Sequence, residues 1–246
     1  MTDPYKFDLN RFASLLTLAN KKEFQDVFFD REANDSHKYI LWRHDVDIDL
    51  NASIVMAKLE AKMGIKSTYF LMTRGRFYNL FSKEGRNTVK KLLELGHQIG
   101  LHCYLNVSRT RQVSQEYIER EVKRDFAILD PFFGEGIFQH TVSFHNPPQC
   151  VLGLKFSSFL STYKEQFVKE IKYLSDSNAN WRDGPPEDWF EKTSYSKFSI
   201  LLHPIIWVFG GSSIQEIIKK IYIARAETMI QDLENDFQTR LDSIIC

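Results

Sequence analysis

Three charged side chains occupy alternate positions at the end of one short apolar run. Arg43, Asp45 and Asp47 are separated by single residues, and extended backbone directs alternate side chains to one face, so the three should point together. Two carboxylates this close repel each other unless a cation lies between them, and we expect that cation to be either Arg43 or a metal ion. The competing interpretation is a surface aspartate pair that joins Asp49 at a helix N-terminus.

Two histidines stand at the ends of later apolar runs. His102 and His145 each close such a run, and in parallel α/β barrels the active site lies at the carboxyl ends of the strands. A carboxylate with imidazoles is the usual ligand set of a catalytic zinc that keeps one coordination position open. The pattern predicts a divalent metal site, with zinc as the expected ion and these histidines as nitrogen ligands. An isolated histidine, by contrast, is more often a hydrogen-bonded structural residue.

A third histidine ends the last apolar run. His203 is followed by Pro204, which must end regular strand pairing. Imidazole has an unperturbed pKa close to neutral, so a histidine beside a metal site is suited to act as a general acid. The alternative is that His203 only makes a hydrogen bond in a turn.

A polar loop between the last two apolar runs contains residue types that bind sugars. Residues 176–186 include Asp176, Trp181 and Arg182 and are interrupted by glycine and prolines. Aromatic faces stack on pyranose rings, and binding residues are concentrated in loops. We expect these three residues, together with Arg43, to contact substrate. The alternative for Trp181 is that it anchors the loop.

These residues need a sheet to bring them together, and the order of elements predicts a parallel one. Short apolar runs alternate with helical patterns, which is the order of parallel strands joined by crossover helices. About seven such units, with no glycine-rich phosphate loop after the first strand, favour an α/β fold of the distorted (β/α) barrel type over an open doubly wound sheet. The predicted strands lie at 39–44, 65–72, 98–102, 141–145 and 198–203, with weaker candidates near 160 and at 171–174.

Capping residues mark the crossover helices. Asp49 and Ser82 stand where N-caps are expected, and Gly64 and Gly96 supply the left-handed residues that end the two helices. A longer helix is predicted over residues 114–129.

Amphipathic helical patterns flank the predicted barrel on both sides. Residues 9–19 form the N-terminal pattern, and residues 213–246 keep apolar residues at helical spacing for about nine turns. No linker interrupts the chain, so we expect one domain over residues 1–246 with its core at about 39–211. The C-terminal helix should pack on the barrel or on a second subunit, and in the second case the protein is a homodimer.

Composition excludes several classes of function. The 246 residues include 32 Lys plus Arg and 32 Asp plus Glu, so no excess charge points to nucleic acid or an anionic membrane as a partner. The longest clean apolar run, 205–209, is too short to span a bilayer. The N-terminus shows no uninterrupted apolar signal region, and the three cysteines are widely spaced without a CxxC pair. These features lead us to expect a cytoplasmic protein in a reducing compartment.

Taken together, these residues resemble the polysaccharide deacetylases, a metal-dependent family that includes chitooligosaccharide and peptidoglycan N-deacetylases. The similarity covers roughly residues 39–211. Residues 45–47 (DVD) look like the family's pair of aspartates, and residues 96–100 (GHQIG) look like the lead-in to its histidine motif. His102 matches the first histidine of that motif, whereas Asn106 stands at the second.

The resemblance assigns roles to the strand-end residues. It implies that Asp45 is the catalytic base and Asp47 a metal ligand. Residues 144–148 (FHNPP) take the place of a motif that normally carries Arg and Pro-Tyr. His145 in that segment is expected to supply the imidazole that Asn106 does not, because an amide is a poor zinc ligand.

Two further motifs complete the resemblance. Asp176 and Trp181 are similar to the motif that contributes an aspartate and a tryptophan to the substrate groove. Residues 201–203 (LLH) look like the motif that provides the general acid, which implies that role for His203.

The whole pattern is closest to divergent deacetylase-like proteins of bacterial surface-polysaccharide gene clusters that carry no secretion signal. It implies a metal-dependent hydrolase that removes an N-acetyl group from a sugar in surface polysaccharide biosynthesis, with a carbohydrate as substrate. Two alternatives stay open, because a fold does not fix a function. One is a non-catalytic carbohydrate-binding protein on a deacetylase scaffold, and the other is a hydrolase of another C–N or ester bond.

Overall fold

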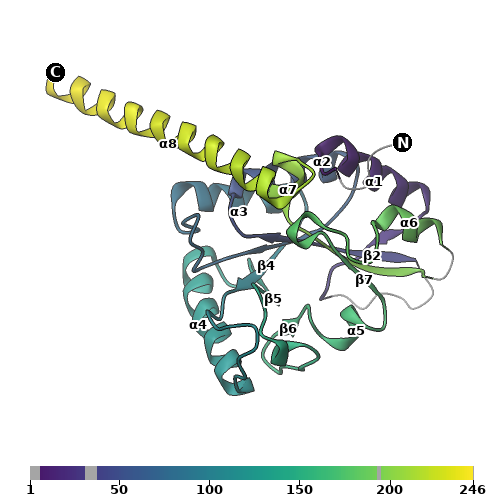
Figure 1. Ribbon diagram of the computed structural model, residues 1–246. Helices are drawn as coiled ribbons and strands as arrows, with labels where there is room; N and C mark the ends of the chain where they lie inside the picture. The colour runs from purple at the N-terminus through teal and green to yellow at the C-terminus, as the bar shows by residue number, and fades with distance from the viewer. Residues whose placement is uncertain (1–5, 31–37, 193–194, 246) are drawn as a thin grey trace.

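The sheet predicted from the sequence is present, and its strands are parallel. The computed structural model describes residues 6–30, 38–192 and 195–245 (Figure 1). The strand order is β6-β5-β4-β3-β2-β8-β7, and the short β1 pairs with the start of β2. The strands are β1 (Gln25–Asp26), β2 (Tyr39–Val46), β3 (Thr68–Leu71), β4 (Gln98–Cys103), β5 (Gln139–Phe144), β6 (Leu160–Ser161), β7 (Lys172–Ser175) and β8 (Lys197–Leu202).

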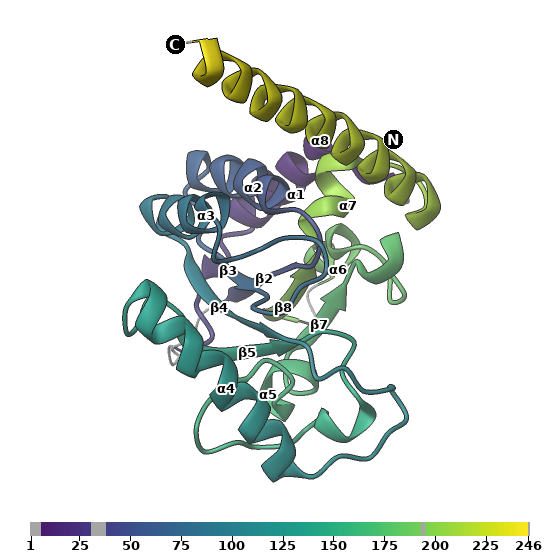
Figure 2. The ribbon, with the colours of Figure 1, turned by 90° about the vertical axis from the view of Figure 1, so that its left-hand side faces the viewer.

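The sheet curls into an open barrel (Figure 2). β6 and β7 end the strand order, so hydrogen bonds among the described residues do not close the ring. The interior is tightly filled at Gly100, where a β-carbon would lie 2.5 Å from the ring of Phe70 and 2.8 Å from the carbonyl oxygen of Thr141. The prediction of a distorted barrel of about seven parallel strands is confirmed, and β6 and β7 are the two weaker candidates.

Helices surround the barrel (Figure 2), and the predicted caps begin and end them. Asp49 and Ser82 each accept a hydrogen bond from a backbone N–H of the first turn. Gly64 and Gly96 follow the same two helices with φ of 76° and 86°, the left-handed conformation that suits glycine. The α-helices are α1 (Leu9–Lys21), α2 (Leu50–Lys62), α3 (Lys83–Glu94), α4 (Gln115–Phe133), α5 (Glu165–Val168), α6 (Pro186–Glu191), α7 (Pro204–Phe209) and α8 (Ile214–Ile245), and short 3₁₀ turns lie at Gln149–Val151 and Ser177–Ala179.

A buried polar cluster ties α2 to the sheet. The carboxylate of Glu60 accepts hydrogen bonds from the hydroxyls of Ser67 and Tyr69 at 2.8 and 2.6 Å. Its Oε1 also lies 2.7 Å from Nε2 of His44, on β2. His44 points away from the barrel interior, as the alternation along β2 predicts, because the neighbouring residues Arg43 and Asp45 point inward.

The C-terminal helix α8 packs on the barrel only through its first turns. Ile217 and Ile221 are buried, and Nη1 of Arg225 donates a hydrogen bond to the carbonyl oxygen of Ile48 at 3.0 Å. The C-terminal part of the helix extends away from the barrel (Figures 1 and 2). The helix predicted from residue 213 onward is confirmed, and residue 246 lies outside the described residues. Within the described ranges, no helix is long and apolar enough to cross a membrane.

Candidate metal centre

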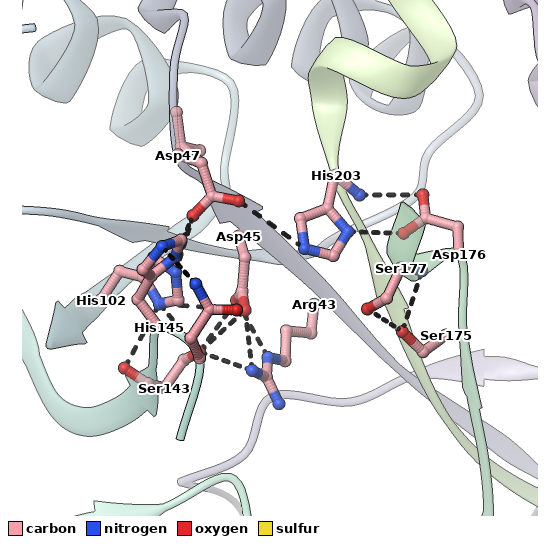
Figure 3. A network of polar contacts seen from close by, with 12 residues as sticks. Arg43, Asp45, Asp47, His102, Ser143, His145, Ser175, Asp176, Ser177 and His203 are labelled. Carbon is pink, nitrogen blue, oxygen red and sulfur yellow. Dashed lines mark hydrogen bonds and ion pairs between the residues drawn. The ribbon is translucent and has the colours of Figure 1, made fainter. Parts of the chain in front are cut away.

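Three of the predicted residues meet at the carboxyl edge of the barrel. Asp47 follows β2, His102 lies near the end of β4, and His145 follows β5. Oδ1 of Asp47 lies 2.9 Å from Nε2 of His102 and 2.8 Å from Nδ1 of His145. Figure 3 shows both rings beside this carboxylate, and one ligand atom from each residue lies within 4.8 Å of the others. The barrel therefore brings together the ligand set expected from the sequence.

Neighbouring polar groups fix the direction of each imidazole. Nδ1 of His102 lies 3.0 Å from Oγ and 3.3 Å from the carbonyl oxygen of Ser143. A carbonyl oxygen only accepts, so Nδ1 carries a proton and Nε2 is directed at Asp47. The side-chain amide of Asn146 lies 2.9 Å from Nε2 of His145. An outward N–H bond of the kind that His102 makes to Ser143 holds an imidazole ligand in one orientation in metal sites.

The donor set fits a small divalent cation. Two imidazole nitrogens point at one carboxylate oxygen, and a cation bound about 2.0–2.2 Å from nitrogen and oxygen ligands would replace the N–H protons there. Burial raises the pKa of Asp47, but hydrogen bonds from His102 and His145 outweigh this effect and hold the pKa well below its usual range. Asp47 is therefore an anion at neutral pH, as a metal ligand must be.

Asp45 lies deeper in the barrel, where an arginine from its own strand holds it. Nε and Nη2 of Arg43 donate to its two oxygens at 2.9 and 2.7 Å, and the hydroxyl of Ser143 lies within 3.0 Å of both. Burial raises the pKa of Asp45, but the charges of Arg43 and His102 outweigh it, so the pKa is lowered. The prediction that Arg43 contacts substrate needs correction, because its guanidinium is buried against Asp45.

His203 approaches Asp47 from another side of the site. Its Nε2 lies 3.8 Å from Oδ2 of Asp47, and its Nδ1 lies 2.6 Å from Oδ1 of Asp176 (Figure 3). Asp176 also accepts hydrogen bonds from the backbone N–H of His203 and from Nε1 of Trp207, both at 2.9 Å. Burial lowers the pKa of His203, but the charge and hydrogen bond of Asp176 outweigh it and raise the pKa to about 9. A protonated His203 thus directs Nε2 into the site.

The loop residues predicted to bind sugar have other positions. Asp176 is fully buried, and its two carboxylate oxygens accept hydrogen bonds from His203 and Trp207. It is therefore not accessible to substrate. Trp181 is only 5% exposed and packs with its ring centroid 6.4 Å from that of Trp207. The prediction of a stacking surface at Trp181 is wrong, and the alternative of a loop anchor describes it. Arg182 is exposed, and its contact with substrate stays a prediction.

Ser143 and Tyr104 also belong to the site, although neither is the polar residue that ends an apolar run in the sequence. Ser143 stands two residues before His145, so the alternation along β5 places both on one face. Tyr104 stands two residues after His102, is half-buried, and lies edge-on to the ring of His145 with centroids 5.3 Å apart. Asn106, which stands at the second histidine position of the motif, is exposed.

Comparison with known proteins finds similarity only among solved structures. No protein-family model and no curated protein sequence matches this chain. A CE4 esterase from Streptococcus mutans is 14% identical, with a TM-score of 0.48 and coverage of 78% of this chain and 84% of that one.

Two further neighbours are equally distant. The catalytic domain of a peptidoglycan N-acetylglucosamine deacetylase from Eubacterium rectale is 13% identical, with a TM-score of 0.43 and coverage of 79% and 87%. A CE4 family pseudoenzyme from Bacillus anthracis is 13% identical, with a TM-score of 0.44 and coverage of 81% of this chain and 65% of that one. The structural neighbours are CE4 polysaccharide deacetylases and a related pseudoenzyme.

Proposed function

We propose that the protein is a metal-dependent hydrolase that removes an N-acetyl group from a sugar. The observation that carries the proposal is the arrangement around Asp47. Imidazole nitrogens of His102 and His145 converge on its Oδ1, and Nε2 of His203 lies 3.8 Å from its Oδ2. One carboxylate thus has two metal-ligating nitrogens on one oxygen and a proton donor near the other, which is the set of groups that metal-assisted amide hydrolysis requires.

In this proposal Asp47, His102 and His145 hold the ion. A bound divalent cation supplies a Lewis acid that polarises the amide carbonyl and lowers the pKa of a water. Three protein ligands are the usual number in a catalytic zinc site, because the remaining position must stay open for water and substrate. Zinc is the proposed ion, since imidazole nitrogen and carboxylate oxygen are among its preferred ligands.

Asp45 and His203 move the protons. Arg43 and Ser143 keep Asp45 ionised, so Asp45 takes the proton of the attacking water at a carboxylate oxygen. Its lowered pKa makes Asp45 a weak base, and a bound cation would supply the acidity that the water needs for this transfer. His203 gives the proton at Nε2 to the departing nitrogen as the C–N bond breaks. The products are acetate and a free amino sugar.

The proposed substrate is an N-acetylated sugar in a cytoplasmic precursor of a surface polysaccharide. The resemblance of residues 39–211 to deacetylases of that kind supports it. Tyr104 supports a sugar-binding groove at this edge, because its half-buried ring lies beside His145. Tyr104 is thus an aromatic side chain next to the candidate metal ligands, where it can stack on a sugar ring. Trp181 was expected to have that role, but it is buried.

The test is metal content by elemental analysis, measured beside acetate release from N-acetylglucosamine oligomers and nucleotide sugars. Wild-type protein should hold about one metal ion per chain. Asp47→Asn should lose metal and activity together. Asp45→Asn should keep the metal while turnover falls by roughly 10² to 10⁴, the usual contribution of a positioned proton acceptor. Asp49→Asn is the matched control, because asparagine also caps a helix and Asp49 caps α2.

Other outcomes would contradict the proposed activity or favour one of the alternative functions. A protein without metal that releases no acetate contradicts the proposal, and sugar binding in that case supports the carbohydrate-binding alternative. A metal-loaded protein that releases a different acyl group, or cleaves an ester, supports the other alternative, a hydrolase of another C–N or ester bond. Should Asp45→Asn lose the metal while Asp47→Asn keeps it, the roles of the two aspartates are exchanged.

A further inference from the structure

Helix α8 carries an apolar stripe that its own barrel does not cover. Tyr222, Met229, Leu233 and Phe237 are between 49% and 78% exposed. Together with Ala226 they recur every three or four residues, so at 3.6 residues per turn they line one side of the helix. Large apolar side chains that are exposed in a continuous line mark an interaction surface more often than an ordinary monomer surface.

This stripe is not the face that packs on the barrel. Ile217 and Ile221 are buried against the barrel, and Arg225 on the same side bonds to the carbonyl oxygen of Ile48. At about 100° per residue, the buried pair lies roughly 140° around the helix from the stripe. The stripe reaches Phe237, and the C-terminal part of α8 extends away from the barrel (Figure 1). α8 therefore has one face for its own barrel and a second face that the described part of the chain leaves uncovered.

The charges on α8 change sign along its length. This pattern favours a second copy of the same helix, in antiparallel orientation, as the partner. A parallel pair of such helices would place like charges side by side, whereas an antiparallel pair places each basic half beside an acidic half. A helix that lies on an anionic membrane carries Lys and Arg on its polar face, and the outer half of α8 is acidic. The first half has Lys219, Lys220 and Arg225 against Glu216, and residues 226–237 have Glu227, Asp232, Glu234 and Asp236.

We propose that α8 pairs in antiparallel orientation with α8 of a second copy of this chain, through the stripe. With the two-fold axis midway along residues 218–237, Ile218 faces Phe237 of the second copy and Tyr222 faces Leu233. Ile218 is also exposed, so the surface spans the whole of this segment. The same patch serves both copies, as a two-fold interface requires. The pairing is independent of the proposed hydrolase activity.

The first test is sedimentation equilibrium of the full-length protein, compared with two glutamate variants. Leu233→Glu places a carboxylate in the stripe, and Gln231→Glu places the same group on the opposite side of the same turn. The wild-type chain should be a dimer. Leu233→Glu should raise the dimer dissociation constant at least about 100-fold, because each of two copies loses a buried leucine. Gln231→Glu should leave it within a few-fold, and circular dichroism should show equal helix content in both variants.

The second test establishes orientation by exchange of charges. In the antiparallel pair Lys219 lies level with Asp236 of the second copy. Lys219→Glu or Asp236→Lys alone should weaken the dimer several-fold, and the double variant should restore it, because each ion pair is rebuilt with its charges reversed. In a parallel pair, each residue lies beside the same residue of the second copy, so Lys219 and Asp236 would not be paired. The double variant would then not restore association.

Three results would overturn the proposal. The first is a monomeric wild-type protein at concentrations up to about 100 μM, where even a weak dimer would associate. The second is equal association of Leu233→Glu and wild type, which would place the interface elsewhere. The third is binding of the monomer to phosphatidylcholine–phosphatidylserine vesicles that Leu233→Glu abolishes, which would make a lipid surface the occupant of the stripe.

Discussion

Replacing Glu60 by alanine should destabilise the protein strongly, because this buried carboxylate joins α2 to two strands. Ser67 and Tyr69 donate hydroxyl hydrogen bonds to it, and His44 lies 2.7 Å away. Alanine leaves all three partners buried without an acceptor. Removing one member of a buried, hydrogen-bonded pair costs about 3–5 kcal/mol, since the remaining polar groups keep their desolvation penalty.

Two further variants separate the charge from the shape. Glu60→Gln keeps one acceptor oxygen and nearly the same volume, so we expect a smaller loss of about 1–3 kcal/mol, the cost of leaving one buried donor or acceptor unsatisfied. Glu94→Ala is the control, because that carboxylate is 47% exposed and pairs with Lys91 on the surface of α3. Such pairs contribute at most about 1 kcal/mol. Urea unfolding followed by circular dichroism measures all three variants.

The pH dependence gives an independent check on the same cluster. Burial raises the pKa of Glu60, but the charge and hydrogen bond of His44 outweigh it and lower the pKa. The stabilisation is therefore complete above the unfolded value of about 4.3 and is lost as the pH falls through the lower folded value. Wild-type protein should show an acid loss of stability that Glu60→Gln lacks. A loss below about 1 kcal/mol for Glu60→Ala at neutral pH would refute the reasoning.

Three other predictions concern the site and its supporting loop. Asn106→His should leave metal content unchanged, because His145 already fills the ligand set, and a sharp rise in zinc affinity on titration would show that His145 is not a ligand. Trp181→Ala should lower the free energy of urea unfolding by about 3–5 kcal/mol, as expected for a buried tryptophan, whereas a change only in substrate affinity would restore the stacking role. In metal-free protein, Asp176→Asn should move the pKa of His203 from about 9 toward 6.5 by NMR titration. The stability from this pair is present below pH 6.5 and fades as the pH rises through 9 in wild type, and an unchanged pKa in the variant would contradict the assignment.

The strands that position the site could be predicted because their signals are local. The predicted strands at 39–44 and 98–102 lie within β2 and β4, where apolar runs are bounded by caps and glycines. Those signals depend on sterics and hydrogen bonds between residues a few positions apart. β1 was not predicted, because two residues are too few to show any periodicity, and its pairing depends on the distant start of β2.

The loop after β7 could not be assigned from its sequence. A polar loop with a tryptophan has the same composition whether it lines a sugar groove or folds into the core. The structure turns the loop at Asn178 and Ala179, with φ of 61° and 54°. Asparagine tolerates this left-handed conformation but alanine rarely adopts it, so the sequence does not mark a turn that extends over both residues. As a consequence, Asp176 and Trp181 are both buried, where the sequence predicted that they face substrate.

The structure of β2 shows which groups lie beside Asp45 and Asp47, which the sequence alone left open. Alternation predicts that Arg43, Asp45 and Asp47 share a face, but it does not say which cation separates the two carboxylates. Arg43 reaches Asp45, two residues along the strand, and its guanidinium is directed into the barrel. β2 ends at Val46, so Asp47 lies beyond the strand, and its carboxylate turns to imidazoles from neighbouring strands. Asp45 thus has Arg43 as its positive partner and Asp47 has two imidazole contacts, so both carboxylates can stay ionised while Asp47 is left for a metal.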